Sequence, residues 1–189
     1  MIVTLRLATG NPGKARELTR LLGCLVLPIE DWEPPIEDAD TFLGNALIKA
    51  QAGARVCPGE WVIADDSGIE VAALAGAPGT QSARFGGDGL SDAERCSALL
   101  RAVEGSGDRF ARFRCVLVAL GPQGEEIIAE GVLEGALAEE ARGSGGFGYD
   151  PILIPTGETR SCGELSPQEK DAISHRGAAV RQLRDALGL

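Results

Sequence analysis

Four short segments hold most of the residues whose types and spacing suggest chemistry. They are Thr9–Lys14 (TGNPGK), Ala64–Gly68 (ADDSG), Gly146–Pro151 (GFGYDP) and Glu169–Arg176 (EKDAISHR). In that order they offer glycines with a lysine for a phosphate, carboxylates for a divalent metal, aromatic rings for a base, and cationic donors for its carbonyl groups. The set predicts a site that binds a nucleoside triphosphate with Mg²⁺ and cleaves it.

The first segment contributes Thr9, Gly10, Asn11, Pro12, Gly13 and Lys14. A predicted strand, Val3–Ala8, precedes it and a predicted helix, Lys14–Leu22, follows, so its N–H groups lie at a helix N-terminus, where an anion is favoured. It is not a Walker A loop, because only two residues separate the glycines and Ala15 follows the lysine. On its own, an ordinary strand–helix turn explains the segment better than a phosphate site does.

Asp65 and Asp66 follow a short predicted strand, Trp61–Ala64, where two carboxylates need a cation or donors to offset their desolvation. Adjacent residues of a strand face opposite ways, so we expect one acid to face a metal and the other to hold structure. Glu37, in the acidic loop 30–40, could complete a Mg²⁺ site with Asp66. Other acids of that loop compete with Glu37, and an ordinary acidic turn is the alternative interpretation of the Asp pair.

Residues 142–148 contain the letters of a dinucleotide-binding fingerprint, with glycines at positions 143, 145 and 148. We reject that interpretation, because Tyr149-Asp150-Pro151 cannot open a helix. We expect instead a glycine-rich loop that presents Phe147 and Tyr149, either to stack on a base or to pack on the core.

His175 is the only histidine, and with Arg176 it lies at a predicted helix start. A metal site needs several ligands, so the two are interpreted as hydrogen-bond donors suited to a base carbonyl, with ordinary helix surface charges as the alternative.

The remaining pattern predicts an α/β protein with a mixed sheet. The predicted strands are Val3–Ala8, Trp61–Ala64, Phe113–Leu120, Glu125–Glu130 and Ile152–Ile154, and residues 131–137 could extend the meander. The predicted helices are Lys14–Leu22, Thr41–Val56 capped by Asp40, one after each of the capping boxes Ser91–Glu94 and Ser166–Glu169, and a last one capped by Ser174. A turn at Gly121–Gly124 predicts an antiparallel pair.

Composition narrows the class of protein. The 189 residues, 44% of them hydrophobic, suit one domain with room for two lobes. A net charge of −10 argues against a nucleic-acid partner, since such proteins need a basic face. No apolar run is long enough to span a bilayer and the first residues do not read as a signal peptide, so we expect no membrane partner and a cytoplasmic location.

The whole chain resembles the non-canonical purine NTP pyrophosphatases, also called the inosine triphosphate pyrophosphatase or Ham1-like family. The resemblance rests on five segments in family order. They are T-G-N-x-x-K-x-x-E from Thr9, T-F-x-x-N-A-x-x-K-A from Thr41, A-D-D-S-G-I-x-V from Ala64, G-x-G-G-F-G-Y-D-P from Gly143, and E-K-x-x-x-S-H-R from Glu169.

This resemblance implies hydrolysis of ITP, dITP and XTP to the monophosphate and pyrophosphate, which removes damaged purines from nucleotide pools. It implies a single ITPase-like domain over residues 1–189, with an elongated mixed sheet flanked by helices and two lobes with an active-site cleft between them. Mg²⁺ dependence and a homodimer are implied as well.

The resemblance also assigns residues. Thr9–Lys14 would hold the triphosphate, Glu37 and Asp66 would hold Mg²⁺, and Asp66 would accept a proton. The implied substrate contacts are Ser67, Phe147, Gly148, Tyr149, Asp150, Lys170, His175 and Arg176. Lys170, His175 and Arg176 offer mainly donors, which favours the 6-oxo group of hypoxanthine and xanthine over the amino group of adenine.

The chain departs from the family pattern in three places: Gly44 replaces a frequent Glu, Cys96-Ser97 replaces an Asn-rich segment, and Asp171 replaces Asn. None removes a predicted catalytic group. Two alternatives remain, a Maf-like pyrophosphatase acting on modified pyrimidine nucleotides and a non-catalytic nucleotide-binding module. The F-G-Y-D and S-H-R segments favour the purine enzyme, and Glu37 with the Asp pair favours catalysis.

Overall fold

Five α-helices and six strands form within residues 4–30 and 32–189, the part of the chain that the computed structural model describes. The helices are α1 (Pro12–Leu22), α2 (Phe42–Val56), α3 (Asp92–Ala102), α4 (Pro167–Ile173) and α5 (His175–Leu187). The strands are β1 (Thr4–Leu7), β2 (Leu25–Pro28), β3 (Trp61–Val71), β4 (Phe110–Leu120), β5 (Glu126–Leu137) and β6 (Leu153–Pro155). None of the helices in these residues has the length and apolar character needed to cross a membrane.

The strands form one mixed sheet in the order β2-β1-β3-β4-β5-β6. β1 runs parallel to both neighbours, with Leu5 opposite Val26 of β2 and Trp61 of β3, and α1 and α2 lie in the crossovers that parallel strands require. β5 and β6 run antiparallel. The tight turn between β4 and β5 is closed by a bond from Gly121 N–H to Glu125 O at 2.8 Å. The predicted fold class, α/β with a mixed sheet flanked by helices, is confirmed.

The chain divides into two compact units, which we call unit 1 and unit 2. Unit 1 consists of Met1–Asp66, Cys115–Gly131 and His175–Leu189, and unit 2 of Ser67–Arg114 and Val132–Ser174. The predicted site residues up to Asp66, together with His175 and Arg176, therefore belong to unit 1. Ser67, the residues of 147–150 and Lys170 belong to unit 2.

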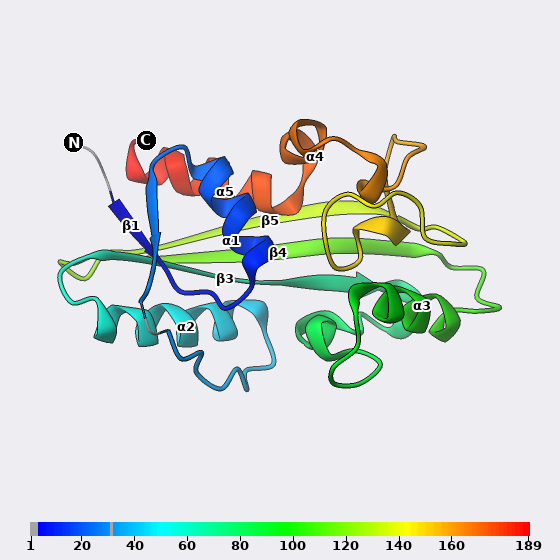
Figure 1. The fold of residues 1–189 in the computed structure, drawn as a ribbon, viewed down its shortest axis with the longest axis horizontal. Helices are drawn as coiled ribbons and strands as arrows, with labels where there is room; N and C mark the ends of the chain where they lie inside the picture. Colours follow the sequence, from blue (N-terminus) through cyan, green and yellow to red (C-terminus); the bar gives the residue numbers. More distant parts are fainter. Residues whose placement is uncertain (1–3, 31) are drawn as a thin grey trace. The chain divides into compact units, whose positions relative to one another are not determined.

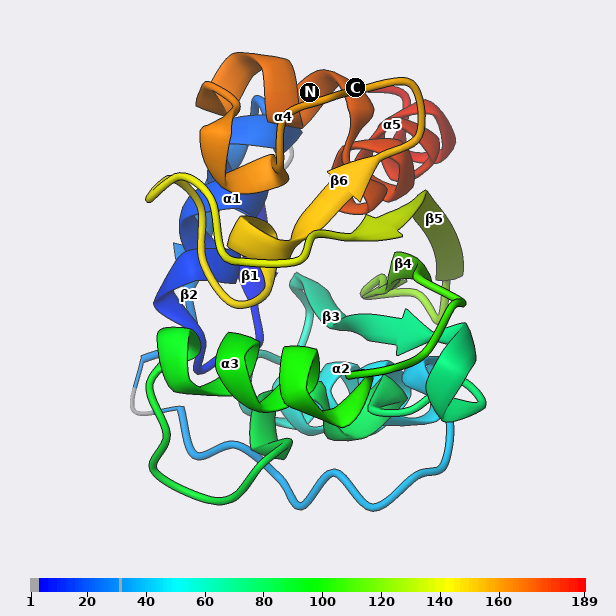
Figure 2. The ribbon, with the colours of Figure 1, turned by 90° about the vertical axis from the view of Figure 1, so that its right-hand side faces the viewer.

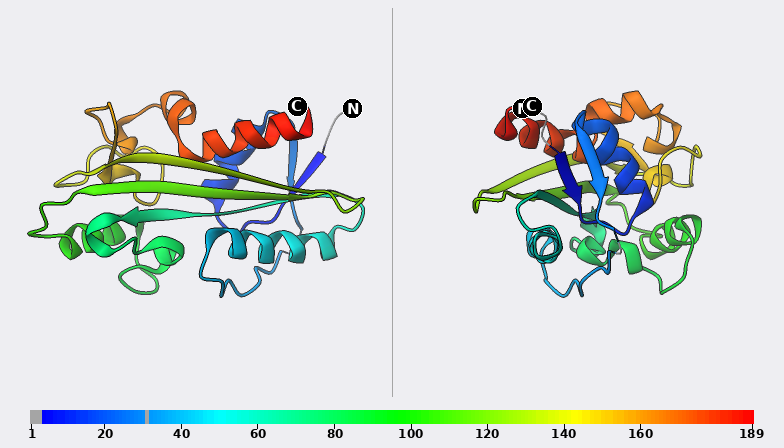
Figure 3. Two further views of the ribbon diagram at one scale, coloured as in Figure 1. Left: turned by 180° about the vertical axis from the view of Figure 1, so that it is seen from behind. Right: turned by 60° about the vertical axis from the view of Figure 1, so that its left-hand side comes forward.

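In unit 1, α1 and α5 cover one face of the strands and α2 covers the other (Figures 1 and 3). Leu18 of α1 and Leu183 of α5 are buried in one cluster with Leu117 of β4. Ala50 of α2 and Val118 of β4 belong to the cluster on the opposite face. Since neighbouring residues of β4 point to opposite faces, this strand serves both clusters.

In unit 2, α3 and α4 lie on opposite sides of the strands (Figure 2). Leu99 of α3 is buried with Val71 of β3, Phe113 of β4 and Ile152 in a single core cluster. Tyr149 belongs to the same cluster. The core therefore anchors both α3 and the end of the glycine-rich segment.

Two helices begin differently from the sequence predictions. Thr41, and not Asp40, caps α2, because the helix begins at Phe42 and the Thr41 hydroxyl accepts from Gly44 N–H at 3.0 Å. α1 begins at Pro12, earlier than predicted, because proline supplies a helical φ at the first position. The capping boxes that start at Ser91 and Ser166 are confirmed.

The strand predictions needed larger corrections. The prediction that a strand ends at Ala64 is wrong, because β3 continues through the Asp pair to Val71. The carboxylates do not end the strand, since side-chain cations offset their burial, as described below. Residues 131–137 continue β5 rather than adding a strand. Strand β2 was not predicted from the sequence. It lies at the edge of the sheet, where its terminal proline is tolerated.

Candidate active site

Asn11 organises the turn that leads into α1. Its side chain accepts from the N–H groups of Gly13 at 2.8 Å and Lys14 at 3.1 Å, and Thr9 Oγ1 accepts from Asn11 N–H at 3.2 Å. The side chains of Thr9 and Asn11 therefore act here as hydrogen-bond acceptors within the turn. Residues 10–12 are exposed at the N-terminus of an 11-residue helix, a position that favours an anion.

Lys14 reaches from α1 to the Asp pair on β3. Its Nζ lies 3.1 Å from Asp65 Oδ2 and 4.0 Å from Asp66 Oδ1. Asp65 is 0% exposed and Asp66 6% exposed, so solvent screens these interactions poorly. Lys14 thus offsets part of the charge that two adjacent buried carboxylates bring.

Lys49 of α2 lies between Glu37 and Asp66. Its Nζ is 2.7 Å from Glu37 Oε2 and 3.4 Å from Asp66 Oδ1. The two carboxylates that were expected to share a metal are therefore both within ion-pair distance of one ammonium. Metal binding by the two acids stays a prediction.

Asn45 of α2 joins the same cluster. Its Nδ2 donates to Asp66 Oδ2 at 3.2 Å, and its Oδ1 accepts from Ala39 N–H at 3.0 Å. One side chain thus connects the backbone two residues after Glu37 to the carboxylate of Asp66. A Cβ on Gly44 would lie 2.5 Å from the Ala39 Cβ, so the glycine that departs from the family pattern allows this close approach.

The two acids of β3 have pKa values shifted in opposite directions. Burial acts to raise the pKa of Asp65, but opposing charges, first those of Lys14 and Arg176, hold it below its ordinary value. Burial raises the pKa of Asp66 above its ordinary value, despite the charges of Lys49 and Lys14. Asp66 is therefore the better proton acceptor of the two, while Asp65 stays ionised.

Arg176, at the start of α5, is 2% exposed and pairs with acids of unit 1. Its Nη1 forms a short ion pair with Glu17 of α1, and its Nη2 lies 3.8 Å from Asp65 Oδ2. The alternative of ordinary surface charges is wrong for Arg176, because these buried acids hold it inside the unit. His175 is 5% exposed, and substrate contact by either residue stays a prediction.

Sequence analysis missed the roles of Glu17, Asn45 and Lys49, although all three lie in the quoted segments. Asn45 and Lys49 are four residues apart, so they share one face of α2, and both are buried. Their polarity beside buried Ala46 and Ala50 is the signal that could have identified them.

In unit 2, Asp150 folds the glycine-rich segment back on itself. Its Oδ2 accepts from Phe147 N–H at 2.8 Å and from Lys170 Nζ at 2.6 Å. Lys170 Nζ also lies 5.2 Å from the centre of the Phe147 ring, within cation–π range. Gly146 has a φ of 73°, and a side chain there would collide with the Asp150 carboxylate, so glycine is required for this turn.

The two aromatic residues of this segment differ in their surroundings. Tyr149 is buried, and its hydroxyl donates to Ser82 O at 2.7 Å. Phe147 is half-buried. Of the two uses considered for these rings, Tyr149 packs on the core, and stacking of Phe147 on a base stays a prediction. The expectation that Tyr149-Asp150-Pro151 cannot open a helix is wrong for a 3₁₀ helix, because Asp150–Ile152 forms one. No α-helix begins there, which agrees with the rejection of a dinucleotide fingerprint.

Glu37 and Asp66 remain the predicted ligands of a Mg²⁺ ion that would be shared with a substrate. Within the described residues, no group of three or more His, Cys, Asp or Glu side chains could hold a metal ion unaided. Mg²⁺ commonly needs only one or two protein carboxylates and completes its shell with waters and substrate phosphates. The two carboxylates of Glu37 and Asp66 both lie within ion-pair distance of the Lys49 ammonium.

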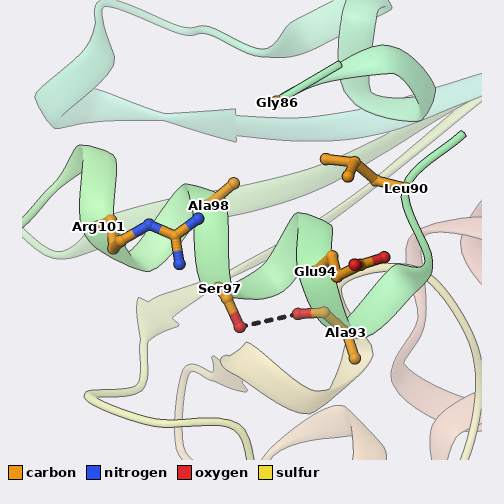
Figure 4. Close-up of a pocket in the computed structure, with 7 residues that line it drawn as sticks. All are labelled: Gly86, Leu90, Ala93, Glu94, Ser97, Ala98 and Arg101. Atoms are coloured by element: carbon orange, nitrogen blue, oxygen red, sulfur yellow. Dashed lines mark hydrogen bonds between the residues drawn. The ribbon is translucent and has the colours of Figure 1, made fainter. Parts of the chain in front are cut away.

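A hollow of about 440 Å³ lies beside α3 in unit 2 (Figure 4). Its lining residues are Gly86, Leu90, Ala93, Glu94, Ser97, Ala98 and Arg101. The Ser97 hydroxyl, drawn in Figure 4, donates to Ala93 O at 2.9 Å within the helix. None of the predicted site residues lines this hollow, so it is separate from the candidate active site.

The fold and the acid–lysine cluster define an α/β protein suited to a phosphorylated, metal-bound substrate. The Ham1 family pattern matches residues 5–186, and the chain belongs to this family. A dITP/XTP pyrophosphatase from Thioalkalivibrio sulfidiphilus is 50% identical over 191 aligned residues, covering 96% of each chain. A HAM1 protein from Coxiella burnetii has a TM-score of 0.88 at 41% identity, and the Staphylococcus aureus Ham1 protein 0.87 at 35%, each with 98% coverage of both chains. The resemblance drawn from the five segments is confirmed.

Proposed function

We propose that this protein hydrolyses the purine nucleotides dITP, XTP and ITP to the monophosphate and pyrophosphate, and so clears them from the nucleotide pool. The observation that carries the proposal is the convergence of Lys14, Lys49 and Asn45 on Asp66. The chain belongs to the Ham1 family, and the name of its 50% identical relative, a dITP/XTP pyrophosphatase, supports dITP and XTP as substrates.

The charge of the cluster gives a reason for a divalent cation. Its charged side chains are Glu17, Glu37, Asp65, Asp66, Lys14, Lys49 and Arg176, four anions and three cations, which leaves a formal charge of −1. A triphosphate adds further negative charge, and repulsion is weakly screened at a buried site. Mg²⁺ held by Glu37 and Asp66 would supply positive charge to the phosphate oxygens and acidify a water.

Residues of the chain would bind the triphosphate, activate the water and stabilise the leaving group. Thr9–Lys14 would bind the triphosphate at the N-terminus of α1. The Lys14 ammonium would then leave Asp65 and pair with phosphate oxygens instead. Asp66, whose pKa is raised by burial, would hold the attacking water and accept its proton. Attack at the α-phosphorus would release pyrophosphate, whose charge Lys14 and Lys49 would stabilise.

The nucleoside would be bound by Ser67, by the glycine-rich segment around Phe147 and by the segment Glu169–Arg176. Phe147 offers a half-buried ring for the base, and Lys170 beside it offers a donor. Further proposed contacts are Ser67, Gly148, Tyr149, Asp150, His175 and Arg176. Donors favour a 6-oxo base, because adenine would leave a buried donor facing a donor. A homodimer is proposed from the family resemblance, and a cytoplasmic location is proposed because it suits an enzyme that acts on the nucleotide pool.

A panel of nucleotides with separate detection of pyrophosphate and orthophosphate tests the proposal. We expect dITP, XTP and ITP to yield pyrophosphate, ATP to have a kcat/KM lower by about 100-fold or more, and EDTA to abolish turnover. An Asp66→Asn protein purified in parallel excludes a contaminating enzyme. Orthophosphate as the primary product, or full activity in EDTA, would contradict the proposal.

A further inference from the structure

Helix α3 contacts both backbone groups of Gly148, the residue after Phe147. Asp92 Oδ2 accepts from Gly148 N–H at 2.7 Å, and Cys96 Sγ donates to Gly148 O at 3.3 Å. Asp92 and Cys96 are four residues apart, so they present their side chains on one face of the helix. The peptide groups on both sides of Gly148 are thus bound to a single helix of the same unit.

Helix α3, which makes these bonds, is itself held in place by its N-terminal cap and by core packing. Its N-terminus carries the capping box of Ser91 and Glu94, and Leu99 and Cys96 are buried in the unit 2 core. Arg95 also donates to carbonyl oxygens of the preceding loop, including Leu90 O at 2.8 Å. A side chain on this helix can therefore fix a loop that binds to it.

The Phe147 backbone is held on its other side as well. Its N–H donates to Asp150 Oδ2, which also accepts from Lys170. Phe147 therefore lies between two restraints, Asp150 at its own N–H and α3 at the next residue. Two restraints that flank one residue leave its backbone little freedom, so they fix the position from which the Phe147 ring projects.

We propose that Asp92 and Cys96 are positioning residues for the nucleobase: by fixing Gly148 they hold the Phe147 ring in the orientation that receives the base. The inference rests on the proposed function, since the base is the ligand assigned to Phe147. Burial raises the pKa of Cys96 to about 12, so the thiol remains a protonated donor at neutral pH.

Kinetics on matched variants tests the role of Asp92. Asp92→Ala removes the acceptor, and we expect KM for dITP to rise about fivefold or more while kcat changes by less than about twofold. Asp92→Asn keeps an acceptor oxygen and should restore most of the affinity. Ser97→Ala removes a side-chain hydrogen bond on the same helix, beside the hollow of Figure 4, and should leave KM unchanged.

Two variants test the role of Cys96 in the same way. Cys96→Ala should raise KM, and Cys96→Ser, which keeps a donor, should recover it. A fall confined to kcat or to thermal stability, with KM unchanged in both alanine variants, would assign the two residues to structure alone and overturn the inference.

Amide hydrogen exchange of the nucleotide-free protein supplies a readout that needs no activity. The peptide containing Gly148 should exchange faster in Asp92→Ala than in wild type, and at the wild-type rate in Ser97→Ala. If wild type cleaves no purine nucleoside triphosphate, the proposed function fails and the inference falls with it. If wild type is active but Asp92→Ala keeps its KM and its exchange rate, the inference alone fails.

Discussion

Lys49 Nζ lies 2.7 Å from Glu37 Oε2, so a helix cation occupies the space beside a carboxylate proposed to hold the metal. Burial acts to lower the pKa of Lys49, but the charges of Asp65 and Asp66 and the bond to Glu37 hold it above its ordinary value. Lys49 is therefore charged in the nucleotide-free protein, and a divalent cation must compete with it.

Lys49→Met should tighten metal binding in the absence of nucleotide. Removing the ammonium leaves the Glu37 and Asp66 carboxylates without their shared counter-ion, so we expect the Kd for Mn²⁺ to fall about tenfold or more. Calorimetric titration with Mn²⁺ measures this. Lys49→Arg, which keeps the charge, serves as the control, and an unchanged Kd in Lys49→Met would show that the ammonium does not compete with the metal.

Asp66→Asn and Asp65→Asn should have different effects. Loss of the proton acceptor in Asp66→Asn should lower kcat about 10²–10⁴-fold while nucleotide binding remains measurable. Asp65→Asn should mainly reduce the free energy of unfolding, because Asp65 is the buried partner of Lys14 and Arg176. Steady-state kinetics and urea denaturation of both variants test this division. Wild-type kcat in Asp66→Asn would make Asp66 a structural residue.

Breaking the buried pair of Arg176 and Glu17 should strongly destabilise unit 1. Arg176→Ala leaves Glu17 buried without its partner, and we expect a loss of about 3–5 kcal/mol in the free energy of unfolding. The double variant with Glu17→Ala should lose less than the sum of the two single losses. Additive losses would mean that the two side chains stabilise the fold independently.

The proposed base contact of Arg176 has its own test. If Arg176 reads the base, Arg176→Ala should raise KM for ITP and narrow the difference in kcat/KM between ITP and ATP. Kinetics with the two nucleotides at a temperature where the variant is folded measures this. Equal losses for both would restrict Arg176 to its ion pairs.

Acid should weaken α4 through Glu169. Hydrogen bonds from the backbone and hydroxyl of Ser166 and from Arg160 lower the pKa of Glu169 to about 2 from an ordinary 4.5. A carboxylate with a depressed pKa stabilises the fold above its ordinary pKa, and the effect is lost as pH falls from about 4.5 toward 2. Thermal unfolding across this window should show a steeper loss in wild type than in Glu169→Gln. Parallel curves would show that Glu169 does not contribute.

Local chemistry explains what could be predicted from the sequence. A capping box needs only Ser166 and Glu169, three residues apart, and both ends of the motif are visible in the chain. The alternation of Asp65 and Asp66 along β3 predicts that they meet different partners. Arg176 beside Asp65 and Lys49 beside Asp66 agree with this, although Lys14 lies within ion-pair distance of both acids.

Pairing across long separations explains what could not be predicted. Arg176 and Glu17 are 159 positions apart, and only the packing of α5 beside α1 brings them together. The same holds for Lys49, whose place depends on how α2 packs against β3. The error at the end of β3 has this origin as well, because the strand passes through two acids whose compensating cations come from other elements.

The distribution of aromatic side chains between the units has a practical consequence. The chain has two tryptophans, Trp32 and Trp61, and a single tyrosine, Tyr149. Both indoles belong to unit 1, and the phenol is buried in unit 2. Selectively excited indole fluorescence therefore follows the melting of unit 1, and far-ultraviolet circular dichroism follows the helices of both units. Unfolding experiments can thus tell whether the units lose structure together or in sequence, without an attached dye.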